Sequence, residues 1–293
     1  MMSKNHGSIQ HGTELYSPEV AEQKAEKTAT IHFAGKGPQK VKYVEIEGLA
    51  IMEGDIVIAP VEEIRSKEER DTTEDFGAEF TFVMEVGARW PDGIVPYLID
   101  PALPEPERVL MAIEHWNTNT IIRLVPHTGE TNHIRFIPGS GCSSPMGMQG
   151  GEQFITLGSD CTRGNAIHEI GHALGMYHEQ SSPNRDQFVE IKMENIKDEA
   201  KFNFDKATFL EAGTIGDYDY NSIMHYGAFA FSKNGEQTII PKIDVQIGQR
   251  NGLSELDIAG INALYGDVQD EHNEHHTIGL QMAAADGREP VHP

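Results

Sequence analysis

The sequence predicts an α+β fold, because strand-like and helix-like segments both recur along the chain. Short apolar runs bounded by glycine, proline or polar residues indicate strands. They occupy residues 28–35, 40–60, 121–126, 133–138 and 151–158. Apolar residues at helical spacing indicate helices at 104–120 and 253–266, with a shorter pattern at 194–204. Ser254, followed by Asp257, is expected to begin the last helix, and Gly266 to end it.

The size and charge of the chain limit its possible functions. It has 293 residues, 38% of them apolar, and a formal net charge of −23. This length suffices for one large domain or two modest ones. The negative charge excludes a nucleic-acid-binding protein of the usual basic kind. No segment approaches the ~18 apolar residues of a membrane-spanning helix, so we expect neither nucleic acid nor a membrane as a partner.

Composition divides the chain into three zones. Residues 1–80 are rich in charge and poor in aromatic residues, and 64–77 are expected to form an exposed linker. Residues 81–266 have a globular pattern. Residues 267–293 lack periodicity and are expected to be a disordered tail, in which His272, His275 and His276 are solvated rather than metal-binding.

The segment HEIGHALGMYHEQ, residues 168–180, carries three histidines. His168 and His172 are four residues apart, so on a helix they share one face. At this spacing two imidazoles can bind one zinc ion at ~2.0–2.1 Å. Glu169, beside the first histidine, is placed to take a proton from a water that the metal activates. The pattern therefore predicts a catalytic zinc site.

A glycine explains how a third histidine could reach the same ion. His178 lies six residues beyond His172, which a continuous helix would place on another side. Gly175 tolerates a positive φ, so we expect the helix to end there and the chain to turn back. Gly171 is expected to allow close packing at some cost in helix propensity. The alternative, a core helix with hydrogen-bonded histidines, would bury a glutamate without a charge partner.

A second segment, YNSIMHYG at 220–227, is expected to support this site. Met224 in a tight turn would give the zinc site an apolar floor that excludes water. Tyr226, two residues later, would bring its hydroxyl near the metal. The segment alone would be an ordinary turn, and it gains meaning only beside the histidine motif.

These motifs resemble the signature of the astacins, a family of zinc metallopeptidases in the metzincin class. Both the histidine motif and the methionine turn are complete, and the similarity covers about residues 81–266. The resemblance implies a two-lobed catalytic domain, with a twisted mixed sheet and helices above the cleft and an irregular lower lobe. It also implies a proenzyme of bacterial type, with a propeptide at 1–80 whose boundary lies between 70 and 84.

The resemblance also implies roles for the site residues. His168, His172 and His178 match the zinc ligands. Glu169 matches the general base, which polarises the water that attacks a peptide carbonyl and passes its proton to the leaving amine. Tyr226 matches a tyrosine that ligates the metal at rest and then stabilises the oxyanion.

Three further residues match positions outside this centre. Glu179 matches the acid that meets the buried new N-terminus of mature members. Arg250 matches an arginine that attracts acidic side chains just beyond the scissile bond; a surface arginine is the alternative. Asp55, in MEGDIVI, matches an aspartate that replaces the catalytic water in proenzymes, although Met52 stands where phenylalanine is usual. The alternative for Asp55 is a Gly-Asp turn between two strands.

The two cysteines are ambiguous by count alone, because a disulfide and two free thiols are equally ordinary. The resemblance implies that Cys142 and Cys161 form one of the two family disulfides. The second is absent, since Ile121 stands where the family usually has cysteine. A disulfide implies an extracellular setting, although residues 1–20 contain no apolar signal-peptide region.

We therefore expect a secreted, monomeric, zinc-dependent endopeptidase that acts on proteins or peptides and is latent until its propeptide is removed. A binding module that keeps zinc only for structure would have lost Glu169 or Tyr226, and both are present. It would also have a closed four-ligand site, whereas three histidines leave a position for water. A different hydrolase, such as an amidase, is disfavoured by the complete methionine turn.

Overall fold

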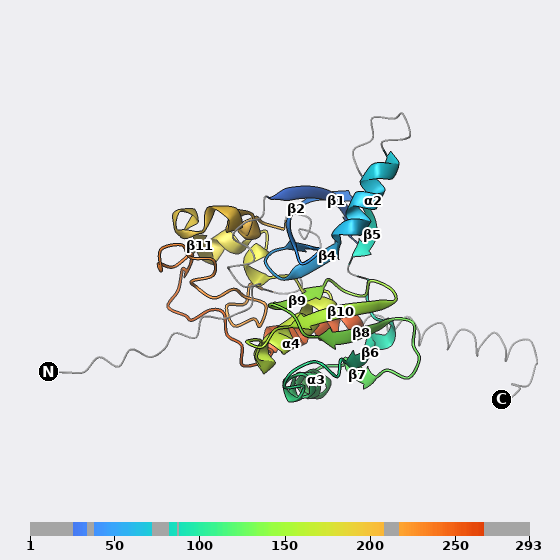
Figure 1. The fold of residues 1–293 in the computed structure, drawn as a ribbon. Helices are drawn as coiled ribbons and strands as arrows, with labels where there is room; N and C mark the ends of the chain where they lie inside the picture. The colour runs from blue at the N-terminus through green and yellow to red at the C-terminus, as the bar shows by residue number, and fades with distance from the viewer. Residues whose placement is uncertain (1–25, 34–37, 72–81, 87, 208–216, 267–293) are drawn as a thin grey trace, which may run out of the picture.

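The computed structural model describes residues 26–33, 38–71, 82–86, 88–207 and 217–266. Their strands form a ten-stranded mixed sheet in the order β5-β1-β2-β3-β4-β9-β10-β8-β6-β7, and a separate pair, β11-β12. Figure 1 shows the N-terminal strands above the strands and helices of residues 94–173, with the segment around β11 to one side. No helix among the described residues is both long enough and apolar enough to cross a membrane.

The N-terminal segment, residues 26–71, forms an antiparallel meander followed by a helix. Its elements are β1 (Lys27–Phe33), β2 (Pro38–Ile46), β3 (Leu49–Met52), β4 (Ile56–Pro60) and α2 (Val61–Asp71). Strand β5 (Phe82–Val86) pairs in parallel with β1. Apart from Met146, the buried residues of the segment's main apolar cluster all come from the segment itself, between Ala29 and Ile64. The segment therefore has a core of its own.

The sheet continues into a second part that carries the histidine motif. Its strands are β6 (Ile94–Ile99), β7 (Arg123–Pro126), β8 (His133–Ile137), β9 (Cys142–Pro145) and β10 (Glu152–Leu157). Only the β9–β10 pair is antiparallel among these neighbours. Helices α3 (Glu107–Asn119) and α4 (Arg163–Ala173) and a helix at 255–266 bury their apolar faces in one core with these strands. Indole N–H groups of Trp90 and Trp116 donate to carbonyls of α4 and so fix that helix.

Residues 179–207 and 217–252, which we call the irregular lobe, contain mostly short elements. They are the 3₁₀ turns Glu179–Ser181, Arg185–Gln187, Met193–Asn195 and Asp198–Phe204, and the strands β11 (Val189–Ile191) and β12 (Ile239–Pro241). Another 3₁₀ turn, Pro91–Gly93, precedes β6.

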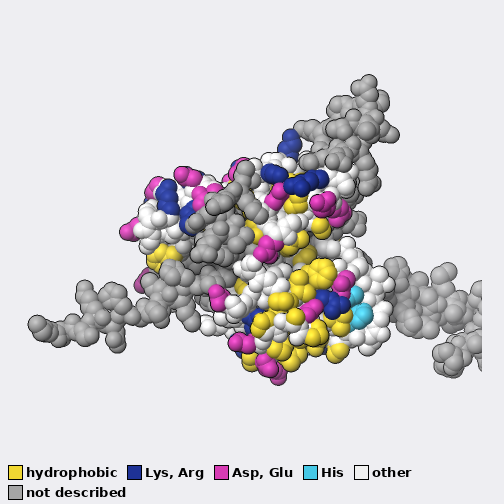
Figure 2. All heavy atoms as spheres, in the orientation of Figure 1, with side chains coloured by type: hydrophobic (Ala, Val, Ile, Leu, Met, Phe, Trp, Pro, Cys, Tyr) yellow, Lys and Arg dark blue, Asp and Glu magenta, His cyan; other side chains and the backbone are white. Residues whose placement is uncertain are grey.

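Figure 2 shows acidic and basic side chains interspersed over the N-terminal strands, where Glu45 pairs with Lys27 at 2.6 Å and with Arg65 at 3.1 Å.

The mixed sheet with its helices confirms the predicted α+β fold, and strands or helices lie at the expected main positions. The linker prediction was wrong for residues 64–71, because these residues belong to helix α2. This helix buries the side chains of Val61 and Ile64. The pattern at 194–204 forms 3₁₀ turns instead of an α-helix. Ser254 and Asp257 cap the last helix as predicted, each backbone N–H donating to the other's side chain at 2.9 Å. The predicted tail lies outside the described residues.

Candidate metal centre and active site

Helix α4 positions the first two histidines. Thr162 caps its N-terminus, and the Thr162 and Asn165 side chains each accept a hydrogen bond from the other's backbone N–H, which fixes where the helix starts. His168 and His172 are both fully buried, with ring centroids 4.6 Å apart. The helical spacing therefore places two imidazoles side by side, as the sequence predicts.

The turn predicted at Gly175 is confirmed and brings in the third histidine. Gly175 has φ +101, its N–H donates to His172 O at 2.8 Å, and the Met176 N–H donates to Gly171 O at 2.9 Å. These two bonds form a Schellman motif, which ends a helix in a left-handed residue. His178 follows, 1% exposed, with its ring centroid 4.6 Å from that of His172.

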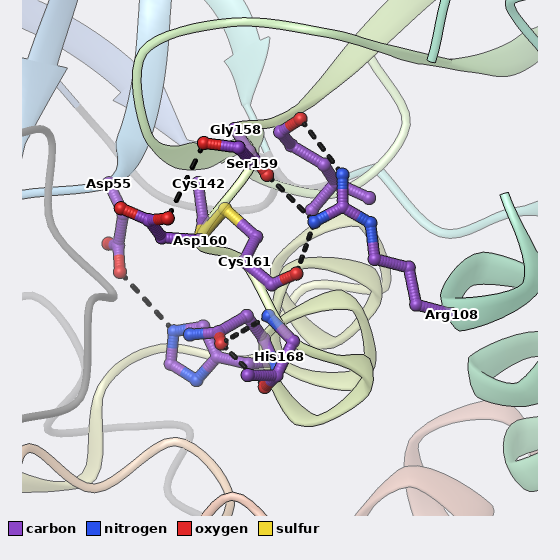
Figure 3. The surroundings of a disulfide bond; sticks show 11 residues. Asp55, Arg108, Cys142, Gly158, Ser159, Asp160, Cys161 and His168 are labelled. Carbon is purple, nitrogen blue, oxygen red and sulfur yellow. Dashed lines mark hydrogen bonds and ion pairs between the residues drawn. A yellow bond between two sulfur atoms is a disulfide. The ribbon is translucent and has the colours of Figure 1, made fainter. Parts of the chain in front are cut away.

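The three imidazoles converge on Asp55 of the N-terminal segment. Its carboxylate oxygens lie 3.3 Å from His168 Nε2, 3.5 Å from His172 Nε2 and 3.3 Å from His178 Nε2. All four side chains are buried, and one ligand atom from each lies within 4.8 Å of the others. Figure 3 shows Asp55 and His168 facing one another beside the disulfide.

This cluster fits a zinc ion. Two ligand atoms about 2.0–2.2 Å from a tetrahedral zinc ion lie about 3.3–3.6 Å apart, which matches the three separations between the Asp55 oxygens and the histidine Nε2 atoms. Asp55 Oδ1, His172 Nε2 and His178 Nε2 have no hydrogen-bond partner among the described residues. Buried polar atoms without partners are costly. Three imidazoles and one carboxylate are also a donor set that zinc prefers.

Electrostatics within the cluster support a bound cation. Burial favours a neutral Asp55, yet the neighbouring histidines outweigh burial and hold the pKa of Asp55 well below its usual range. Burial also lowers the pKa of His178, but the Asp55 and Glu53 carboxylates outweigh it and raise that pKa to about 9. The Asp55 and Glu53 carboxylates therefore favour positive charge within this cluster, which a zinc ion would supply.

The Nδ1–H group of each histidine donates a hydrogen bond to an oxygen acceptor. This bond directs the lone pair of Nε2 towards the cluster. For His168 the acceptor of Nδ1 is Ile223 O at 2.8 Å. For His172 it is Met176 O at 2.7 Å. For His178 it is the Glu53 carboxylate at 2.9 Å. Sequence analysis did not identify Glu53, although its place two residues before Asp55 was an available signal.

The methionine turn lies against the histidine helix. Met224 is 1% exposed, and a Cβ added to Gly171 would lie 2.8 Å from its sulfur. This contact explains the glycine inside α4 and confirms the predicted close packing. The Asp257 carboxylate accepts from Ser222 Oγ at 2.7 Å and from the Ile223 N–H at 2.8 Å. The last helix therefore fixes the turn, a link that the sequence did not reveal.

Tyr226 lies at the edge of the cluster. Its ring centroid is 4.7 Å from that of His178, and its hydroxyl donates a short hydrogen bond to the backbone carbonyl of Glu53. Its backbone N–H donates to Gln180 Oε1 at 2.9 Å. The structure thus brings Tyr226 next to the third histidine but holds its hydroxyl on the N-terminal segment.

The other predicted residues lie around this centre. Glu169 is fully buried on α4. Burial raises the pKa of Glu179 to about 7, although its carboxylate accepts a 2.9 Å hydrogen bond from the Asp219 N–H. The Arg250 guanidinium donates a hydrogen bond to His225 O at 3.2 Å. The pKa of His168 is lowered mainly by burial, and the positive charge of Arg250 is the second largest cause. Arg250 therefore lies within electrostatic range of the histidine cluster.

Cys142 and Cys161 form the disulfide that the resemblance implies, with Cα atoms 6.0 Å apart. It ties β9 to the chain just before α4. Figure 3 shows Arg108, which comes from α3, reaching the backbone of this loop. Its guanidinium donates to the carbonyls of Leu157, Gly158 and Cys161. Sequence analysis did not identify this contact, which stabilises the loop next to the histidine helix.

The N-terminal segment contacts both other parts of the molecule. Strand β4 pairs in parallel with β9, and the Ser144 N–H donates to Asp55 O at 3.0 Å. On the irregular lobe, Phe202 packs against buried residues of β2, β3 and β4, and Lys42 lies 3.1 Å from Asp205. The turn that carries Asp55 is therefore held from two sides.

A mixed sheet, a helix with two histidines, a third histidine after the glycine turn that ends this helix, and a methionine turn together are typical of the metzincin class of zinc proteins. The chain belongs to the astacin family, because the model of that peptidase family, Astacin, matches residues 82–266.

Individual relatives agree with this assignment. Blastula protease 10 of Paracentrotus lividus is 35% identical over 234 residues, which cover 74% of this chain and 39% of that protein. Zinc metalloproteinase nas-15 of Caenorhabditis elegans is 42% identical over 185 residues, 60% of this chain and 32% of that protein. The chain therefore spans well under half the length of these relatives.

Among solved structures, the chain is similar to high choriolytic enzyme 1 (HCE-1), a hatching enzyme zinc-protease from Oryzias latipes. The TM-score is 0.57 and the sequence identity 38%. The match covers 62% of this chain and 94% of that one.

Proposed function

We propose that this chain is a zinc-dependent endopeptidase of proteins or peptides, held latent by its N-terminal residues. The observation that carries the proposal is that three histidine Nε2 atoms converge on Asp55, each 3.3–3.5 Å from one of its carboxylate oxygens, which is the ligand spacing of tetrahedral zinc. Residues 1–80 would be the propeptide, 81–266 the peptidase domain and 267–293 a tail.

His168, His172 and His178 would hold the ion in the active form and leave one position open, as catalytic zinc sites require. The ion would act as a Lewis acid that polarises the scissile carbonyl and acidifies the attacking water. Glu169 would take the proton of that water and deliver it to the leaving amine. Such general acid–base catalysis contributes about 10²–10⁴ in rate.

Tyr226 would donate its hydroxyl to the oxyanion that forms when water attacks the carbonyl. Its place beside His178 supports this role. In the structure the hydroxyl instead donates to Glu53 O, so departure of the N-terminal segment would free it. Met224 would keep the floor of the site apolar, and its contact with Gly171 supports that role.

Latency would arise from two contacts of the N-terminal segment. Asp55 would occupy the ligand position that the attacking water needs. Strand β4 would cover the edge of β9, whose backbone groups could otherwise pair with an extended peptide. Activation would require a cut between about residues 70 and 84, after which the new amino group could meet the half-buried Glu179.

Specificity would depend partly on Arg250. Its guanidinium lies close enough to the histidines to affect His168, and it can hold a carboxylate bidentately. Acidic side chains just beyond the scissile bond would therefore be preferred. The disulfide supports a secreted, extracellular protein, since such bonds persist in oxidising compartments. A monomer is proposed for the active form.

The proposed activity is tested with the chain cleaved by limited trypsin treatment. We expect the cleaved chain to hydrolyse peptides, to lose activity with a zinc chelator and to regain it when zinc is restored. A panel of simple amides serves as the control and should not be hydrolysed. A cleaved chain that binds zinc but hydrolyses no peptide would contradict the proposal.

A further inference from the structure

The three histidines differ in where their outer ring nitrogens find an acceptor. His168 and His172 donate to backbone carbonyls that lie within the family match at 82–266. His178 instead donates to the side chain of Glu53, which belongs to the N-terminal segment. One predicted zinc ligand is therefore oriented by a residue that would leave with the propeptide.

We infer that Glu53 is a positioning residue that holds His178 on the metal, so that the N-terminal segment strengthens zinc binding as well as blocking the site. The inference rests on the proposed function, because it requires zinc at this cluster. It assigns the segment a second task, that of retaining the ion until activation.

The chemistry of the contact supports this role. A carboxylate acceptor fixes the tautomer of a metal-binding imidazole and makes it a better electron donor. The Glu53 side chain is 12% exposed and that of His178 is fully buried, so water and salt weaken the contact little. Loss of such an outer partner typically lowers metal affinity by about 10–100-fold.

A single turn supplies both contacts to His178. Residues 53–55 connect β3 to β4, where Met52 pairs with Ile56. Glu53 meets the Nδ1 side of the imidazole, and Asp55 lies on its Nε2 side. The Tyr226 hydroxyl holds the Glu53 carbonyl. Because both carboxylates belong to one anchored turn, removal of the segment would withdraw them together.

The neighbouring hairpin provides a matched control. Glu47 and Glu53 have nearly the same positive φ, 49 and 48, and each precedes a glycine with positive φ. The Glu47 side chain, however, accepts a hydrogen bond from the Ser140 hydroxyl. Glu47→Gln therefore makes the same chemical change at an equivalent turn position without touching a histidine.

The test uses the uncleaved full-length chain, with its integrity checked by mass spectrometry and its folding by circular dichroism. Zinc affinity is measured by competition with a chromophoric chelator for wild type, Glu53→Gln and Glu47→Gln. The visible spectrum of the cobalt-substituted proteins reports the coordination of the metal directly. We expect Glu53→Gln to bind zinc about 10–100-fold more weakly and to change the cobalt spectrum. Glu47→Gln should match wild type.

A second comparison applies even if Glu53→Gln does not fold. Uncleaved Asp55→Ala lacks the carboxylate ligand but keeps Glu53, whereas cleaved wild type lacks both. We expect uncleaved Asp55→Ala to bind zinc more tightly than cleaved wild type, and equal affinity would overturn the inference. Wild-type affinity and an unchanged cobalt spectrum in Glu53→Gln would also overturn it. If wild type itself binds no zinc at this site, the proposed function fails instead.

Discussion

At the scale of single residues, the candidate centre consists of charged and polar groups that are buried together. His168, His172 and Asp55 are all 0% exposed. Buried polar groups of this kind are stable only when each has a partner. Zinc would supply that partner for every Nε2 atom at once. The residues that do chemistry can then be separated from those that hold the ion.

Glu169 is expected to act on the substrate and not on the metal. Glu169→Ala in the cleaved chain should keep its zinc and lose at least about 10²-fold in kcat, because the general base is gone. Peptide hydrolysis and zinc content are measured on the same preparation. Glu194→Ala, which alters an exposed glutamate of the irregular lobe, is the control. Near-normal turnover with full zinc content would contradict this role.

Arg250 is expected to select acidic residues just beyond the scissile bond. Profiling of cleavage sites in a peptide library should show aspartate and glutamate enriched there, and Arg250→Ala should abolish the enrichment by removing the guanidinium. Arg135→Ala, which removes an arginine paired with Glu152 on the sheet, should leave the profile unchanged. A flat profile in wild type would contradict this role of Arg250.

At the scale of elements, the site depends on how closely α4 approaches its neighbours. Gly171 leaves room for the Met224 sulfur. Gly171→Ala should lower the free energy of unfolding by about 1–3 kcal/mol, since the new methyl group overpacks this contact. Gly260→Ala in the last helix meets no atom within 4 Å and should raise it by up to about 1 kcal/mol. Urea denaturation of the zinc-loaded chains measures both, and equal effects would contradict the packing argument.

The disulfide fixes β9 next to the start of α4. It closes a loop with a sequence separation of 19, so replacing Cys142 and Cys161 by alanine should lower the free energy of unfolding by about 3 kcal/mol. Differential scanning calorimetry should show a lower Tm for this variant than for wild type. An unchanged Tm would mean that Arg108 and the sheet hold the loop without the bridge.

At the scale of the whole molecule, the local spacing of residues predicted many features of the fold and site. Contacts between residues far apart in the sequence could not be predicted in this way. The helix that carries His168, its end at Gly175 and the strands of the sheet follow from periodicity and backbone preference within a few residues. The Glu53–His178 contact joins residues 125 positions apart, and no local pattern encodes it. The helix at 61–71 was not predicted, because its only apolar residues are Val61 and Ile64, which are too few to show a helical period.

The central claim is that the intact chain is a zinc peptidase blocked by Asp55. The most direct test is the peptidase activity of intact wild type and intact Asp55→Ala, both zinc-loaded and shown to be uncleaved by mass spectrometry. The account predicts no measurable hydrolysis by wild type and detectable hydrolysis by Asp55→Ala, because water can then reach the metal. An intact wild-type chain as active as Asp55→Ala would contradict it.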